Sequence, residues 1–345
     1  MSEYRQDPLS RRWVIIGSDR AARPNEFIEE PIRRQPVPCP FCAGNEHETP
    51  EAVASYAAPG KKSAWLVRIV PNKYPAVTAD EALCPQCQPP LGSSSPKDES
   101  IPGFGRHEVI IESPRHVASL SELTTTEAEL VFQAYRDRIA ALKATGQFRY
   151  VQIFKNVGPH AGASLEHVHS QLVALPGVPE IVTQELASCR DYFAKHRSPL
   201  VADLIKREIA AGERIVVQTD HFVAFCPFAS RFPYEVCIAP LANQPSFEAT
   251  QAGELGELSR LARDVIGRIE RTGGQVAYNA VLHTQPFDTP PHDHYHWHIE
   301  IIPRLTKVAG FEWGTGCFIN PLPPEAAAAH LRSSAVAESR LDRSV

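Results

Sequence analysis

Residues 154–171 read FKNVGPHAGASLEHVHSQ, in which an expected strand is followed by a glycine-containing loop and a second strand. Side chains at i, i+2 and i+4 of a strand share one face. His167, His169 and Gln171 are therefore expected on the same side of the second strand, which begins at His167. A solvated strand face, on which alternating polar residues are common, is the alternative interpretation.

This pattern has the chemistry of a phosphate site. An imidazole attacks phosphorus when one nitrogen is free and the other donates a hydrogen bond that fixes the tautomer. Gln171 is able to donate to a phosphoryl oxygen in the transition state. Upstream, Gly162 and Ser164 bring a backbone N–H and a hydroxyl close to a phosphate, as anion-binding nests do. The stretch therefore favours chemistry at phosphorus.

The same order of elements is expected twice along the chain. In the first copy, a strand at 108–111 precedes a helix capped near Thr126 with Glu129 three residues on, a strand at 150–154, a loop and the strand of His167. The second copy has a strand at 235–239, a helix over 250–271, a strand over 276–282, a loop and a last strand with His296 and His298. The short connections favour an antiparallel sheet.

We therefore predict an α+β fold built from a duplicated unit, with one half over residues 1–175 and the other over 176–345. The alternative is that two similar α+β pieces occur by chance.

The bulk properties exclude several classes of protein. The chain has 345 residues, 43% of them hydrophobic, and a formal charge of −5, so no basic excess recommends nucleic acid as a partner. No apolar run approaches the ~20 residues that span a bilayer, and no signal peptide is expected after Met1. Eight cysteines over this length do not suggest a secreted disulfide scaffold, so we expect a cytoplasmic protein with reduced thiols.

Two cysteine pairs have the Cys-x-x-Cys spacing that presents two thiolates to a tetrahedral zinc ion. Cys39 and Cys42 form the first pair, and Cys84 and Cys87, beside a Pro- and Ser-rich stretch, form the second. Together they would make a structural zinc ribbon, although the segment between them is long for one. Alternatively, either pair is an incidental or buried pair of thiols.

Histidines are dense near the C-terminal end, at positions 283, 292, 294, 296 and 298. His296 and His298 are expected to share a strand face, which is a chelating arrangement. A solvated histidine-rich loop is the alternative for His292 and His294.

Taken together, these residues resemble the galactose-1-phosphate uridylyltransferases of the histidine-triad superfamily, over nearly the whole chain. The most specific match is the segment 156–171, in which Val168 stands where a proline is frequent. Other matching segments are 7–24, the zinc knuckle at 39–45, the nucleoside-contacting turn at 72–76 and the stretch 112–116. The resemblance implies duplicated histidine-triad-like units with a mainly antiparallel half-barrel sheet and flanking helices. It also implies a homodimer in which each subunit completes the other's site.

The resemblance further implies roles for individual residues. His169 is the nucleophile that becomes uridylylated, with Gln171 and Ser164 on the phosphates. The implied nucleotide and phosphate contacts are Arg20, Arg23, Asn72, Asn156 and Gly162. The implied zinc ligands are Cys39, Cys42, His116 and His167, which leaves Cys84 and Cys87 outside the family pattern. A second metal site, usually iron or zinc, is implied at Glu185, His283, His296 and His298.

The implied reaction moves UMP from UDP-glucose to galactose 1-phosphate, a step of galactose metabolism by the Leloir pathway, through a covalent uridylyl-histidine. Two displacements at one sugar-phosphate pocket predict ping-pong kinetics. The segment 311–321 looks as much like the related ADP-glucose phosphorylases, so adenylyl transfer, or inorganic phosphate as acceptor, is the first alternative. A histidine-triad hydrolase and a non-enzymatic zinc-binding module are two others. Gln171 argues against the hydrolase, which commonly has a third histidine there.

Overall fold

The computed structural model describes residues 2–19, 38–57, 60, 64–79, 102–274, 276–287 and 292–335. Arg20, Arg23, Cys84 and Cys87 lie outside these ranges. The described strands are β1 (Glu3–Gln6), β2 (Trp13–Ile16), β3 (Ala54–Ala57), β4 (Trp65–Pro71), β5 (Arg106–Ile111), β6 (Tyr150–Val157), β7 (His169–Leu175), β8 (Ile215–Gln218), β9 (Phe222–Phe225), β10 (Val236–Pro240), β11 (Tyr278–His283), β12 (His298–Pro303) and β13 (Phe318–Asn320). The α-helices are α1 (Thr125–Ala144), α2 (Glu180–His196), α3 (Leu200–Ala211), α4 (Ala252–Gly273), α5 (Gly310–Thr315) and α6 (Pro324–Ser333).

Most strands join one ten-stranded sheet, in the order β3-β4-β5-β7-β6-β11-β12-β10-β9-β8. All neighbours in this sheet are antiparallel. A second sheet has the order β1-β2-β13. The α+β class with a mainly antiparallel sheet, predicted from the sequence, is therefore confirmed.

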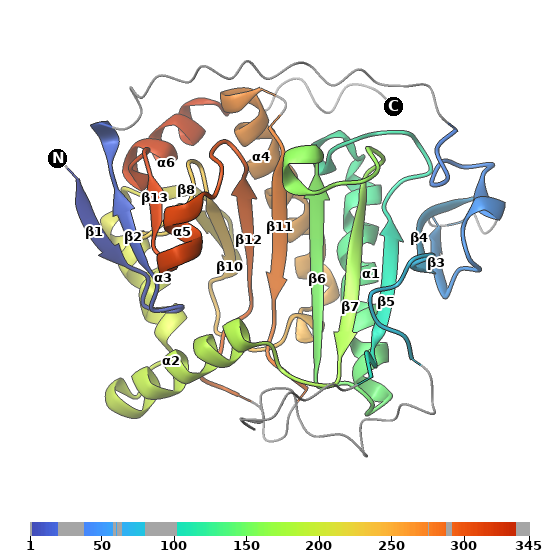
Figure 1. Cartoon of the computed structure of the whole chain (residues 1–345), viewed down its shortest axis with the longest axis horizontal. Helices are drawn as coiled ribbons and strands as arrows, with labels where there is room; N and C mark the ends of the chain where they lie inside the picture. Colours follow the sequence, from blue (N-terminus) through green and yellow to red (C-terminus); the bar gives the residue numbers. More distant parts are fainter. Residues whose placement is uncertain are drawn as a thin grey trace.

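The large sheet repeats one strand pattern on the two sides of the β6–β11 pair. Reading outward, β6, β7, β5, β4 and β3 on one side correspond to β11, β12, β10, β9 and β8 on the other. Helices α1 and α4 pack against each other and lie together behind the sheet (Figure 1). This repetition is what a duplicated unit requires. Because the sheet runs on without a break, a division of the chain near residue 175 stays a proposal.

The core fills the space between the sheet and these two helices. Each helix buries one apolar face: Val131, Tyr135, Ile139 and Leu142 on α1, and Leu258, Leu261, Val265 and Ile269 on α4. Their spacing of three and four residues places each set on one side of its helix. The two helices thus form one layer that covers a single face of the sheet and leaves the other face for a site.

The start of α1 differs from the predicted one by two residues. Its N-cap is Thr124, whose side chain accepts from the Glu127 N–H while the Glu127 carboxylate accepts from the Thr124 N–H. Thr126 and Glu129 have the same spacing, but Glu127 is the acid that also binds Ser113 and Arg115, at 2.8 and 2.6 Å. These tertiary contacts select the earlier capping box.

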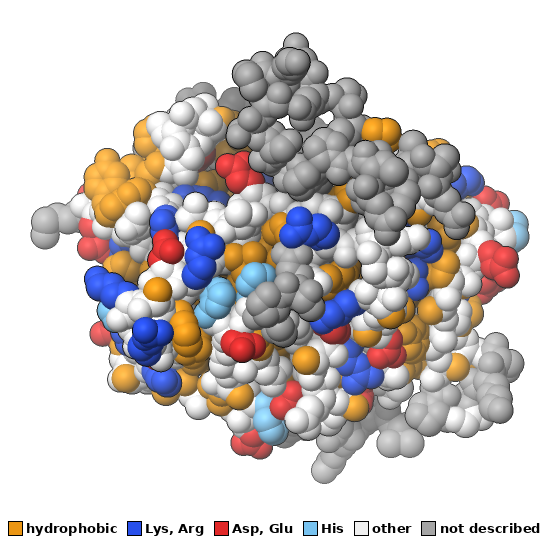
Figure 2. Space-filling view, turned by 90° about the horizontal axis from the view of Figure 1, so that it is seen from below, with side chains coloured by type: hydrophobic (Ala, Val, Ile, Leu, Met, Phe, Trp, Pro, Cys, Tyr) orange, Lys and Arg blue, Asp and Glu red, His pale blue; other side chains and the backbone are white. Residues whose placement is uncertain are grey.

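The surface mixes charges of both signs. On the face shown in Figure 2, Lys and Arg side chains lie in separate groups with acidic side chains between them. That face therefore presents no continuous basic surface within the described residues, whereas binding to a nucleic-acid backbone uses one. Among the described helices, none combines the length and the apolar character that a bilayer crossing needs.

Glu127 provides a test of how α1 is anchored. Burial alone would raise the pKa of Glu127, but hydrogen bonds from Arg115, Thr124 and Ser113 hold it below its ordinary value of 4.5. A carboxylate whose pKa is lowered on folding stabilises the protein above pH 4.5 and loses that contribution as the pH falls through the lowered pKa. We expect Glu127→Gln to lower the free energy of unfolding near neutral pH by about 1–3 kcal/mol.

Urea denaturation of both proteins between neutral and acidic pH measures this difference, which should shrink as the pH drops below 4.5. The control is Glu129→Gln, since Glu129 lies two residues further along the same helix and is exposed. A difference that keeps its size at every pH would contradict the assignment of the lowered pKa to Glu127.

Candidate functional site

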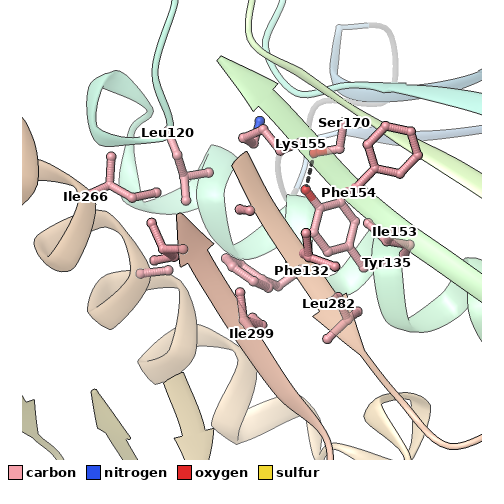
Figure 3. A pocket seen from close by; sticks show the side chains of 14 residues that line it. Leu120, Phe132, Tyr135, Ile153, Phe154, Lys155, Ser170, Ile266, Leu282 and Ile299 are labelled. Carbon is pink, nitrogen blue, oxygen red and sulfur yellow. Dashed lines mark hydrogen bonds between the residues drawn. The ribbon is translucent and has the colours of Figure 1, made fainter. Parts of the chain in front are cut away.

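The predicted nucleophile lies on β7, in the sheet's interior. Ser170 points toward the helices, where its hydroxyl oxygen is 2.5 Å from the Tyr135 hydroxyl oxygen (Figure 3). Strand residues alternate between faces, so His169 and Gln171 point the opposite way. We call this side of the sheet the His169 face. β7 begins at His169. The sequence predicts a start at His167, so this residue lies two positions before the observed strand.

The His169 ring has the tautomer that a nucleophile needs. Its Nδ1 lies 2.7 Å from the carbonyl oxygen of His167, so Nδ1 donates and Nε2 keeps its lone pair. The residue is 9% exposed and packs edge-on against Phe41. Burial lowers the pKa of His169 below its ordinary value of 6.5, which keeps the ring neutral near pH 7.

A buried polar network holds β7 from the helix side. Lys155 Nζ donates to Glu112 at 2.5 Å and to the carbonyl oxygen of His169 at 3.1 Å. Tyr135 and Ser170 both donate to the other oxygen of Glu112, at 2.8 and 2.5 Å. Figure 3 shows Lys155, Tyr135 and Ser170 around a small cavity between sheet and helices. Loss of one charge would leave the other buried and unpaired, so this network fixes the backbone that carries His169.

The loop between β6 and β7 carries the other residues predicted to contact phosphate. Gly162 has a φ of +85°, a left-handed conformation that favours glycine. Asn156 Oδ1 accepts from Asn279 Nδ2 at 2.8 Å, and the same nitrogen donates to the Ala161 carbonyl oxygen, which ties the loop to β11. Ser164 is exposed. The structure orders this loop beside β7, and its phosphate contacts stay a prediction.

Asn72 follows β4 and is connected to the His169 face by His107, a residue that the sequence analysis did not single out. Its Nδ2 lies 3.1 Å from Nε2 of His107 on β5, and this Nε2 lies 2.8 Å from Oε1 of Gln171. The turn predicted to contact the nucleoside is therefore adjacent to the residue predicted to contact the phosphate.

Four residues that were predicted to bind zinc come together. The candidate ligand atoms of Cys39, Cys42, His116 and His167 all lie within 4.8 Å of one another. Cys42 Sγ is 3.4 Å from His116 Nδ1, and Cys39 Sγ is 3.5 Å from His167 Nδ1. This is a complete tetrahedral donor set, which needs neither Cys84 nor Cys87.

The surroundings of His167 suit a metal ligand. His167 Nε2 donates to the carbonyl oxygen of Ser113 at 2.8 Å, which leaves the Nδ1 lone pair directed at the thiols. Burial lowers the pKa of His167 to about 4, so the ring is neutral. The Ala43 N–H donates to the Pro114 carbonyl oxygen, which holds the knuckle against the segment carrying His116.

A second group contains Glu185, His283 and His298, also with ligand atoms within 4.8 Å of one another. His283 and His298 are cross-strand partners with stacked rings, and Tyr295 donates to Glu185 at 2.8 Å. Both His283 nitrogens and Nε2 of His298 are buried and make no hydrogen bond with any described residue, although His283 Nδ1 lies 3.3 Å from Glu185 Oε1. Orphaned ring nitrogens beside a buried carboxylate fit a metal ion.

His296 does not belong to this group, contrary to the prediction. Its Nε2 lies 2.9 Å from the carbonyl oxygen of Pro240 and its Nδ1 lies 3.1 Å from Oδ1 of Asn243. β12 begins only at His298, so the ring of His296 does not follow the strand alternation and turns toward the end of β10 and the residues just after it. His296 thus corresponds to His167 of the first half. The His167 ring contacts Ser113, just after β5, and the His296 ring contacts Pro240, at the end of β10.

Glu300, which the prediction missed, completes the surroundings of His283. Glu300 Oε2 lies 3.4 Å from His283 Nε2 and accepts from Arg231 at 2.8 Å. Burial alone would lower the pKa of His283, but Glu185 and Glu300 raise it to about 10. The two buried carboxylates therefore favour a positive charge at this place, which a protonated His283 supplies without a metal ion and which the ion itself would supply if His283 were a neutral ligand. The available sequence signal was the spacing, because Glu300 follows His298 as Gln171 follows His169.

Two family models match the chain. The N-terminal domain of galactose-1-phosphate uridyl transferase matches residues 1–179, and a domain of unknown function (DUF4921) matches residues 104–343. An ADP-glucose phosphorylase of Arabidopsis thaliana is 34% identical over 335 residues, which is 96% of this chain and 92% of that protein. A galactose-1-phosphate uridylyltransferase of Thermotoga maritima is 28% identical over 348 residues, covering 97% of this chain and 99% of that protein.

Solved structures resemble the whole chain as well. An ADP-glucose phosphorylase from Arabidopsis thaliana with bound ADP-glucose has a TM-score of 0.84 at 32% identity, covering 97% of this chain and 100% of that one. A uridylyltransferase has a TM-score of 0.73 at 28% identity, covering 97% of this chain and 98% of that one.

A pair of glutamine substitutions tests the composition of the second group. Glutamine keeps bulk and polarity but is a poor ligand for transition metals. We expect His298→Gln to lose one equivalent of metal per chain relative to the wild type, and His296→Gln to retain it, because both nitrogens of His296 already face protein oxygens.

Elemental analysis of protein purified from metal-replete cultures measures the difference. Equal losses in the two variants would make His296 a ligand after all. A wild type with one equivalent or fewer would mean that the second group stays unfilled.

Proposed function

This chain belongs to the galactose-1-phosphate uridylyltransferase family, and from this premise we propose that it transfers a nucleoside monophosphate through a covalent bond to Nε2 of His169. The observation that carries the proposal is the hydrogen bond from His169 Nδ1 to the His167 carbonyl oxygen, since it leaves Nε2 unprotonated and able to attack phosphorus. Family membership makes the protein an enzyme; the identity of the nucleotide and of the acceptor belongs to the proposal.

The proposed reaction consists of two displacements at the α-phosphorus of a nucleoside diphosphate sugar. His169 Nε2 forms the N–P bond while the P–O bond to the sugar phosphate breaks, and hexose 1-phosphate leaves. The phosphate oxygen of an acceptor then attacks the same phosphorus, and the electron pair of the N–P bond returns to Nε2. Gln171 donates to the phosphoryl oxygens in both steps, where charge accumulates.

We propose UDP-glucose as donor and galactose 1-phosphate as acceptor, the substrates of the uridylyltransferases that this chain resembles. A second candidate is adenylyl transfer from ADP-glucose to inorganic phosphate. It is favoured by one observation, the higher identity and TM-score of the ADP-glucose phosphorylase from Arabidopsis thaliana. The two candidates share every step at His169 and differ in the base and the acceptor.

We propose that zinc is held by Cys39, Cys42, His116 and His167. Four protein ligands leave no open coordination position, so the ion would be structural. Its effect would reach the reaction through His167, whose ring is a ligand and whose carbonyl oxygen orients His169. The proposed ligands of a second ion, zinc or iron, are Glu185, His283 and His298.

The homodimer is also a proposal. It is supported by large exposed aromatic side chains on the small sheet and the adjoining helix α5, namely Tyr4, Trp13, Phe311 and Trp313. An apolar area of this kind on a soluble protein marks an interaction surface.

His169→Gly tests the covalent step. We expect this variant to lose transfer because no nucleophile remains, while its fold and metal content stay those of the wild type. Added imidazole should restore part of the activity by entering the vacated space. Gln171→Ala should be milder, raising the barrier by about 2.7–4 kcal/mol as loss of one oxyanion donor does. Full turnover by His169→Gly without imidazole would refute the mechanism.

The label that the protein retains identifies the nucleotide. The wild type is incubated with UDP-glucose or ADP-glucose radiolabelled in the α-phosphate, and acid-labile protein-bound label is counted. Label from UDP-glucose with release of glucose 1-phosphate supports uridylyl transfer, and label from ADP-glucose alone supports the second candidate. The control is His47→Gly, a variant at an exposed histidine outside the site.

Cys39→Ser tests the zinc site. We expect one equivalent of zinc to be lost and the free energy of unfolding to fall by several kcal/mol, on the order expected for a structural metal. Elemental analysis and urea denaturation provide the two measurements. The matched control is Cys317→Ser, because Cys317 is a free thiol of similar exposure outside both ligand groups. Retained zinc in Cys39→Ser would refute the assignment.

A further inference from the structure

His107 lies next to Gln171 on the His169 face. Its cross-strand partner is Val173 of β7, two residues after Gln171. Residues in this diagonal relation point to the same side of an antiparallel pair. Nε2 of His107 lies 2.8 Å from Oε1 of Gln171, so the two side chains are in direct contact.

The other nitrogen of the His107 ring determines which atom donates in this contact. The backbone N–H of Ala76 donates to His107 Nδ1 at 3.1 Å. A backbone N–H is only a donor, so Nδ1 is the unprotonated nitrogen of a neutral ring. The proton is therefore on Nε2, and Nε2–H donates to the Gln171 oxygen.

This hydrogen bond determines which end of the Gln171 amide remains available. A carboxamide has an acceptor end and a donor end, and only the donor end binds a phosphoryl oxygen. Because His107 holds Oε1, the NH2 group is the end left for a ligand. A reversed amide would place its oxygen against the phosphoryl oxygens and repel them.

His107 also joins Gln171 to the turn at 72–76. The Asn72 N–H donates to the His107 carbonyl oxygen at 2.9 Å, and Ala76 donates to the ring. Nδ2 of Asn72, 3.1 Å from His107 Nε2, is a second donor and therefore not a partner of the Nε2 proton. The acceptor of the Nε2 proton is therefore Gln171 Oε1.

We propose that His107 is a positioning residue for nucleotidyl transfer, which keeps the donor end of the Gln171 amide directed at the reacting phosphoryl group. The proposal rests on the proposed function, since it assigns His107 a part in that reaction. His107 acts through one hydrogen bond from Nε2, and the hydrogen bond that Nδ1 accepts from Ala76 sets its tautomer.

Two substitutions separate this role from a purely structural one. Glutamine places an amide nitrogen near the position of Nε2, so His107→Gln keeps the donor to Gln171 and loses the acceptor for Ala76. Asparagine places its oxygen near the position of Nδ1, so His107→Asn keeps the acceptor and loses the donor. We expect kcat to fall about 10- to 100-fold in His107→Asn with KM little changed, and to stay within about threefold of the wild type in His107→Gln.

The same comparison is made in the Gln171→Ala background. If His107 acts through Gln171, His107→Asn should lower kcat no further there. A larger loss in His107→Gln than in His107→Asn, or an equal effect of His107→Asn in both backgrounds, would overturn the proposal. If the wild-type protein transfers neither nucleotide, both the proposed function and this inference fail. If the wild type transfers a nucleotide but His107→Gln loses more activity than His107→Asn, only this inference fails.

A measurement on the unaltered protein does not depend on how the variants fold. In the full chain labelled with 15N-histidine, ring nitrogen shifts report the tautomer of each neutral imidazole. Protonated Nε2 and unprotonated Nδ1 are expected for His107, and the opposite assignment would overturn the proposal.

Discussion

The site depends on one residue, His167, whose ring and backbone carbonyl oxygen make contacts in two different parts of the site. Its ring lies against two thiols and donates to Ser113, while its carbonyl oxygen accepts from His169. Any rotation that improved one of these contacts would break another. The tautomer of His169 is therefore a consequence of how His167, two residues earlier, is held, and the contacts of the His167 ring with the two knuckle thiols help to hold it.

The second half of the chain repeats this geometry for another purpose. His298 Nδ1 lies 3.2 Å from the His296 carbonyl oxygen, as His169 lies against His167, and the ring of His296 is held by a carbonyl oxygen as the ring of His167 is. Asn243 contacts His296 in place of thiols, and Glu300 stands where Gln171 stands. The free imidazole nitrogen of His298 then lies beside Glu185 and His283, whereas His169 belongs to no such group of candidate ligands among the described residues. One backbone arrangement thus positions the proposed nucleophile in one half and a candidate metal ligand in the other.

The sequence predicts a feature of this site well when the feature depends only on residues that are close in the sequence. Alternation along one strand is local, so His169 and Gln171 were placed on one face correctly. The partners of those residues are not local: Lys155 and His107 come from the neighbouring strands β6 and β5, and their contacts follow from strand order and register, which the sequence does not reveal. His296 shows the same limit. The Trp297 N–H donates to the Gln244 carbonyl oxygen, and the strand begins only after it. His116 was predicted only through the family resemblance, because nothing in its spacing connects it with the knuckle.

The pairing of β6 with β11 has a consequence for synthesis of the chain. β6 is complete by Val157, but its partner occupies Tyr278–His283, so the ribosome must add more than a hundred further residues before the sheet closes. During that interval the first half presents β6 as an edge strand of eight residues with unpaired backbone groups. Such an edge is a template for association with other nascent chains. A strand that lies at the centre of the finished sheet is thus an exposed edge until the second half of the chain has been made.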